Sequence, residues 1–285
     1  MTKYLKLFFA LFILSLDSCS QDCSKCKIQY EPSTNYSATM TTTSTTILKY
    51  EGTEEIIERL IKKGYTNPST IESEQVVSTT TKTNKFKDSK SFPITFEILT
   101  SKSTQKRNGE IVDKQESQPK NIKLYGNCSK DGKTKIDSVS GENMDEALKN
   151  SFIQIFSSID NIVSFPEKCL KVGDTFTQES PIDIPMSGFE PIKMKITSKY
   201  TLTKKEGKLA FFQVEQKYTL TNSYEKVQIS ASGTGEGSMT VDTDKNYLTS
   251  NISKTELIFK IKAGDLIINM TQIGNTVQTI NLTDN

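Results

Sequence analysis

The sequence predicts a mainly β protein of the α+β class, a curved antiparallel sheet or half-barrel with one long amphipathic helix packed on its concave face. Three observations predict it. Apolar and polar residues alternate with the period of half-buried strands from about Tyr36 onward. Short polar turns join these segments, which favours antiparallel pairing. One segment, between Asn143 and Pro166, changes to the helical period.

The N-terminus is typical of a secretory signal peptide. Two lysines precede an apolar run from Leu7 to Leu16, which is too short to span a bilayer. The end of this run and Ser18 match the lipobox of bacterial lipoproteins, whereas Asp17 departs from that pattern. We therefore expect lipidation of Cys19, with ordinary signal-peptidase cleavage after Ser20 as the alternative.

The chain divides into a signal peptide (residues 1–18), a lipid-anchored tether (residues 19–34) and a single β-rich envelope domain (residues 35–285). A domain of this length can bury a sizeable core. The formal charge of +2 arises from 36 basic and 34 acidic residues without a basic block, so no nucleic-acid partner is expected. The expected partner is the membrane, through the lipid anchor, on the periplasmic or outer-membrane face.

The clearest strand prediction is a long hairpin. Residues Ile192 to Leu202 alternate, a polar turn follows at 204–208, and Phe212 to Leu220 alternate again. Shorter alternations occur at 94–98, 227–231, 257–261 and 266–270. Threonine-rich runs at 41–46 and 79–83 also favour extended chain, because β-branched side chains suit a pleated surface.

Two segments have helical period. The first is short, with Thr53 as its N-cap and Gly64 at its end. The second begins at Asn143, ends before Pro166 and would be about 30 Å long. Its apolar face contains Met144, Leu148, Phe152, Ile155, Ile159 and Ile162. This face and the sheet would form either a packed core or the walls of a cavity for a lipid or another apolar ligand.

Four cysteines remain after cleavage: Cys23, Cys26, Cys128 and Cys169. An even set in an exported protein predicts disulfides, and the sequence does not choose among the three pairings. The Cys23-x-x-Cys26 spacing also occurs in redox motifs and zinc sites. It lies in the tether, however, and the chain has no histidine or second close cysteine pair. We therefore favour structural disulfides and expect no metal and no cofactor.

The absence of histidine excludes Ser-His-Asp triads, histidine-activated cysteines and HExxH metalloproteases. A carboxylate-based hydrolase is the remaining enzymatic alternative, and no acidic pair points to it. Asp242 opens a segment similar to a calcium loop, but Tyr247 stands where that loop needs glycine, which favours a strand turn. The alternating glycines from Gly233 to Gly237 predict a bent strand, with a ligand groove as the alternative.

Several segments of the C-terminal half carry a family resemblance. They are Gly173-Asp174-Thr175-Phe176, Pro181, Pro185-Met186, Ile196 to Leu202, the glycine run and Val241-Asp242. Together, over about Cys169 to Ile261, they resemble an uncharacterised family of Bacteroidota envelope lipoproteins, although phenylalanine replaces an expected tryptophan at position 176. That family has no known activity. The predicted architecture is also similar to the half-barrel of lipoprotein carriers, and fold does not imply function.

The sequence therefore predicts a non-catalytic envelope lipoprotein, a binding or envelope-associated module. The alternative is a carrier of lipid or another apolar ligand held between the helix and the curved sheet. Nothing in the sequence identifies a protein partner.

Overall fold

The computed structural model describes residues 23, 25–87, 90–116, 121–142, 144–146, 149–150, 152–153, 163–184, 191–222 and 228–284. Its strands are β1 (Thr34–Glu51), β2 (Ser69–Thr83), β3 (Ser91–Arg107), β4 (Glu110–Glu116), β5 (Lys123–Ser129), β6 (Thr134–Ser140), β7 (Thr175–Ile184), β8 (Ile192–Glu206), β9 (Leu209–Leu220), β10 (Gln228–Asp242), β11 (Tyr247–Ala263) and β12 (Leu266–Asp284). The helix α2 (Glu54–Lys62) connects β1 and β2.

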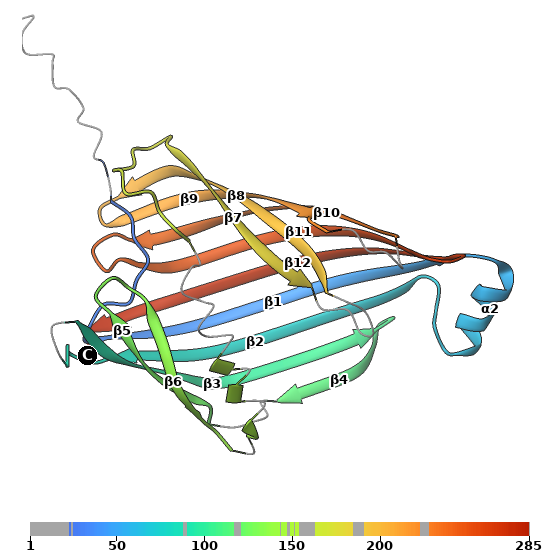
Figure 1. The fold of residues 1–285 in the computed structure, drawn as a ribbon, viewed down its shortest axis with the longest axis horizontal. Coiled ribbons are helices and arrows are strands. Elements are labelled where there is room, and N and C mark those ends of the chain that lie inside the picture. The colour runs from blue at the N-terminus through green and yellow to red at the C-terminus, as the bar shows by residue number, and fades with distance from the viewer. Residues whose placement is uncertain are drawn as a thin grey trace, which may run out of the picture.

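All twelve strands belong to one antiparallel sheet in the order β6-β5-β3-β2-β1-β12-β11-β10-β9-β8-β7, with β4 paired to the far part of β3 (Figure 1). The order consists of two consecutive meanders, one from each half of the chain. They are joined where β1 pairs with β12, from Thr34 opposite Asp284 to Glu51 opposite Ile267. The predicted antiparallel strands are confirmed, including the β8–β9 hairpin, in which Leu202 faces Phe212.

The sheet is curled, as the N-terminal segment shows. Residues 25–33, which we call the strap, cross one end of the sheet. The Gln29 N–H donates to the Asn246 carbonyl oxygen between β10 and β11 at 2.9 Å. A Cβ on Gly132, between β5 and β6, would lie 3.2 Å from the Gln29 Cβ. In a flat sheet β5 and β11 would be about 24 Å apart. A single residue touches both turns because the sheet bends around the strap.

We call the side of the sheet that faces the strap the inner face. Its buried residues form three clusters. The largest joins the strap to strands β8–β12 and β1 through residues such as Cys26, Tyr36 and Phe212. The second lies on β3, β5 and β6 around Leu124. The third lies at the opposite end of β8–β11 around Phe259. The curl thus lets one sheet form most of its own core.

The glycines of β10 lie where the backbone of β11 approaches closely. A Cβ on Gly237 would lie 2.2 Å from the Ile252 carbonyl oxygen of β11, and one on Gly233 would lie 2.4 Å from the Glu256 carbonyl oxygen. Glycine at these positions permits this close approach of a neighbouring strand. Gly235 differs, since a Cβ there would first meet the movable Gln216 side chain, at 2.8 Å.

The predicted long helix packed on the concave face is wrong. The described part of the chain has one helical element, α2, and between Met144 and Ile153 the described residues in helical conformation are 146, 149–150 and 152–153. Met144 and Phe152 pack against the cluster on β3, β5 and β6. Positions 148, 155, 159 and 162 of the predicted face lie outside the described residues. The physical reason is the curl, because a sheet that bends onto the strap and onto itself does not need a long helix to cover its apolar side.

The short helix is confirmed. α2 has Thr53 at its N-cap, acidic residues in its first turn and basic residues in its last, which suits the helix dipole. Gly64 follows with a φ of +85°, a conformation that L side chains rarely adopt.

The close approach of β11 to β10 can be tested with two neighbouring substitutions. Gly237→Ala pushes a Cβ against backbone that cannot move aside, so we expect a loss of about 1–3 kcal/mol in unfolding free energy. Gly235→Ala meets only a flexible side chain and should cost clearly less. Urea denaturation of both variants measures the difference, and equal losses would contradict a backbone clash at Gly237.

Candidate ligand-binding face

The inner face is the candidate functional site. Facing residues of paired strands point to the same side, so the register shows which side chains share this face. Along the strands the face has an aromatic zone at the strap end, a band of uncharged polar residues in the middle and apolar residues toward the other end.

At the strap end four aromatic side chains meet. The Tyr30 ring lies 5.1 Å from the rings of Tyr36 and Tyr247 and 5.6 Å from that of Phe96. Burial raises the pKa of Tyr36 to about 12 and that of Tyr247 well above its usual value. The hydroxyls are therefore neutral at physiological pH. Tyr36 also accepts a hydrogen bond from the Glu31 N–H at 2.7 Å, which holds the strap on the cluster.

The middle band consists of hydroxyl and amide side chains. Its members include Thr42, Ser44, Thr46, Ser73, Ser198, Gln216, Ser253, Thr255, Gln272 and Thr276. All of them except Ser198 are only partly buried. Some pair across strands: the hydroxyl oxygens of Ser44 and Ser73 are 2.7 Å apart, and the Gln216 amide donates to the Ser198 hydroxyl at 3.3 Å. The band thus presents neutral donors and acceptors.

Charge is divided sharply between the two faces. The outer face of β8 carries Lys195, which lies 2.8 Å from Glu179 of β7, and Lys199, which lies 3.1 Å from Glu215 of β9. At the inner positions of β7–β12 and β1–β3, as far as the structure describes them, charged side chains stand only at the ends of strands, at Lys205, Arg107 and Asp284. Between these ends the inner positions of these strands are uncharged, whereas the edge strand β4 has the exposed Asp113 opposite Gln105 of β3.

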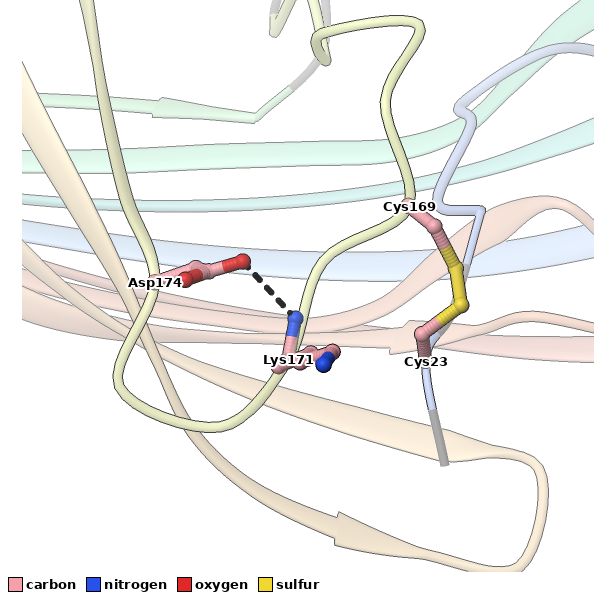
Figure 2. The surroundings of a disulfide bond; sticks show 4 residues. All are labelled: Cys23, Cys169, Lys171 and Asp174. Atoms are coloured by element: carbon pink, nitrogen blue, oxygen red, sulfur yellow. Dashed lines mark hydrogen bonds between the residues drawn. A yellow bond between two sulfur atoms is a disulfide. The ribbon is translucent and has the colours of Figure 1, made fainter. Parts of the chain in front are cut away.

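Figure 2 shows the disulfide that fixes the strap, between Cys23 and Cys169, with the two Cα atoms 5.5 Å apart. Two residues farther on, the Lys171 N–H donates to the Asp174 carboxylate at 3.0 Å. The other two predicted disulfide cysteines, Cys26 and Cys128, are buried and form no disulfide within the described residues. Cys26 belongs to the core cluster of the strap, and Cys128 faces Phe92 across β5 and β3. The predicted lipidation site, Cys19, lies outside the described residues.

Asp242 stabilises the β10–β11 turn, as the strand-turn interpretation predicts. Its carboxylate accepts from the N–H groups of Asp244 and Lys245, each at 3.0 Å, and lies 3.0 Å from the Lys208 ammonium. Burial alone would raise the pKa of this carboxyl, but these donors outweigh it and lower the pKa. Within the described residues no group of three or more His, Cys, Asp or Glu side chains is arranged to hold a metal ion.

The chain was compared with known proteins. No protein-family model matches it, and no curated protein matches it. One similar solved structure is OccK7 (OpdD) of Pseudomonas aeruginosa, with 6% identity over 87% of this chain and 99% of that one and a TM-score of 0.27. Another is the outer membrane protein Omp33 of Acinetobacter baumannii, with 8% identity over 85% and 98% and a TM-score of 0.15. Neither likeness is close enough to establish a shared fold.

No helix in the described part of the chain is both long and apolar enough to cross a membrane.

The cysteine assignment can be tested by alkylation. Because Cys26 and Cys128 are 7% and 0% exposed, we expect both to resist a thiol-alkylating reagent in the native protein and to react in denaturant. Burial also raises the pKa of Cys26, which reduces its reactive thiolate. Peptide mapping should find Cys23 joined to Cys169. A native protein that labels at Cys26 would contradict the buried position of the strap.

The turn carboxylate predicts a pH dependence. Asp242→Asn should lower the unfolding free energy by about 1.5–3 kcal/mol at neutral pH, because charge-assisted hydrogen bonds are lost. Since the folded-state pKa is lowered, the carboxylate stabilises the fold at neutral pH and this contribution is lost as pH falls through that pKa. Denaturation at pH 7 and pH 3 should show the variant converging on the wild type under acid. A constant difference would contradict this role.

Proposed function

We propose that this protein is an exported, non-catalytic binding protein tethered to the cell envelope, and that its inner face holds an uncharged amphipathic ligand of the lipid class. The observation that carries the proposal is the partly exposed inner face of β7–β12 and β1–β3, which has no charged side chain between the ends of these strands. The signal-like N-terminus and the lipobox before Cys19 support the tethered location.

The composition of the inner face matches neither that of a strand face exposed to water nor that of a packed hydrophobic core. The outer face, which meets water, carries paired lysines and glutamates, as exposed strand faces do. A packed core would carry aliphatic side chains, as the cluster around Phe259 does. The band between these apolar regions is partly exposed and yet has only hydroxyl and amide groups. Such groups can hydrogen-bond the neutral polar part of a ligand without the large cost of desolvating a charge.

The same face supplies the apolar part of such a site. Met40 and Val77, which pair across β1 and β2, lie partly exposed beside the polar band, as does Ile98 of β3. A ligand lying along the strands would therefore meet apolar and neutral polar side chains in succession. Its alkyl part would gain from burial against the first group and its polar part would hydrogen-bond to the second. This arrangement favours a lipid over a charged metabolite.

A binding role also fits the chemistry of the groups present. The tyrosine hydroxyls of the strap end are held neutral by burial, so they donate and accept hydrogen bonds rather than exchange protons near pH 7. The proposal therefore assigns binding roles to the face and a catalytic role to none of its residues.

The proposal is tested by placing one charge on either face of the same strand. Thr276→Lys adds an ammonium to the polar band, next to Thr42 and Ser253, whereas Thr279→Lys adds the same group to the outer face of β12. The probe is an uncharged diacylglycerol with a fluorescent acyl chain, and the protein is the mature chain with Cys19→Ser, purified without detergent. We expect Thr276→Lys to weaken binding at least tenfold and Thr279→Lys to leave it unchanged.

Native mass spectrometry of the same preparation shows whether a co-purified ligand of lipid mass is present and whether Thr276→Lys removes it. Failure of the wild type to bind the probe, or equal losses in the two variants, would refute binding on the inner face. Unchanged melting temperatures of both variants exclude a general loss of structure.

A further inference from the structure

The helix α2 stands alone at the end of the molecule opposite the strap (Figure 1). Its apolar stripe consists of Ile56, Ile57, Leu60 and Ile61, and no residue of α2 is buried. Ile56, Ile57 and Leu60 are partly buried, whereas Ile61 is 56% exposed and Tyr65, just after the helix, is 46% exposed. The apolar stripe of α2 is thus only partly covered within the described part of the protein.

The helix is held in place by its flanking loops. The Asn67 side chain donates to the Tyr50 carbonyl oxygen at 2.8 Å and accepts from the Tyr50 N–H at 3.0 Å. The Tyr65 N–H donates to the Leu60 carbonyl oxygen at 3.1 Å, and the Asn108 amide donates to Thr66 at 2.7 Å. A nine-residue helix is too short to be stable alone, so these bonds hold it formed and leave its apolar stripe available.

The size of the stripe argues against a stable protein partner. A nine-residue helix is about 13 Å long, whereas a stable protein interface buries about 800 Å² on each side. A lipid surface requires no such area, since a few aliphatic side chains can insert below the headgroups. Tyrosine is enriched at that depth, and lysine side chains can extend to the phosphates. Tyr65, Lys62 and Lys63 stand at the end of α2 in positions that suit these roles.

The charged side chains of α2 are compatible with insertion of the helix into an electrically neutral lipid surface. Arg59 lies 3.5 Å from Glu55, and Lys62 lies 3.5 Å from Glu58. The polar side of the helix is therefore largely neutralised by its own i,i+4 pairs, and insertion of the stripe does not depend on anionic lipid.

The geometry of the sheet places the two ends far apart. β1 has 18 residues between the strap and α2, a length of about 60 Å. The expected acyl chains at Cys19 lie four residues before the disulfide that fixes the strap. Resting on the proposed lipid tether at Cys19, we propose that α2 is a membrane-contact helix, whose stripe inserts into the phospholipid surface to which Cys19 would be attached, so that the sheet lies along the membrane with both ends attached.

The test uses the absence of tryptophan from the chain. Ile61→Trp places a single tryptophan on the stripe, and Glu58→Trp places one on the polar side of the same helix. Each acylated protein is reconstituted on vesicles of phosphatidylcholine, with and without brominated acyl chains, which quench tryptophan at that depth. We expect quenching of at least twofold for Ile61→Trp and none for Glu58→Trp. Adding Ile57→Gln to Ile61→Trp should reduce the quenching, because the stripe loses an inserting side chain.

The helix is retained in these variants, since glutamine is a better helix former than isoleucine and position 58 is exposed. Quenching that is absent at both positions, or equal at both, would overturn the proposal. Binding of α2 to a protein instead would give no quenching on these protein-free vesicles. Equal melting temperatures of the variants show that the sheet is intact.

Discussion

The constraint on which the rest of the structure depends is the strap across one end of the sheet, held by the Cys23–Cys169 disulfide. Tyr30 and Gln29 of the strap touch turns and strands that would be far apart in a flat sheet. The curl that results gives the sheet an inside and an outside. This difference between inside and outside explains why glycine is needed at Gly237 and why the tyrosine hydroxyls are buried. It also explains why the inner face of β7–β12 and β1–β3 lacks charge between the strand ends.

The two functional proposals rest on the same principle, applied to different surfaces. On the inner face of β7–β12 and β1–β3, partly exposed side chains between the strand ends are neutral. On α2, the apolar stripe is only partly covered, and Ile61 is exposed. In each case the local composition disagrees with what contact with water or with the protein core would favour. A disagreement of this kind is best explained by a partner that shares the chemistry of the surface, and a lipid fits both.

Local features of the fold could be predicted from the sequence, whereas features that depend on distant contacts could not. The alternation of Ile192 to Leu202 indicates a strand, and the caps of α2 indicate a helix, because both signals lie in neighbouring residues. The close approach of β11 at Gly237 depends on a missing Cβ, which the sequence shows directly. The helical period after Asn143 predicts a long helix that covers the apolar side of the sheet. That side is instead covered by the curl of the sheet itself. The disulfide between Cys23 and Cys169 joins residues 146 positions apart, so no local pattern in the sequence indicates this pairing. The strap has the composition of a tether, so its contacts with the sheet could not be predicted either.

The meeting of the first and last strands at the centre of the sheet has a consequence for biogenesis. Each meander contains mostly contacts between neighbouring segments and can begin to form early. The seam between β1 and β12 joins residues on opposite ends of the chain, and closing so long a loop is slow. The sheet is therefore completed only after the last strand has emerged. If the chain is exported N-terminus first, as proposed above, this seam closes only after the last strand has crossed the membrane.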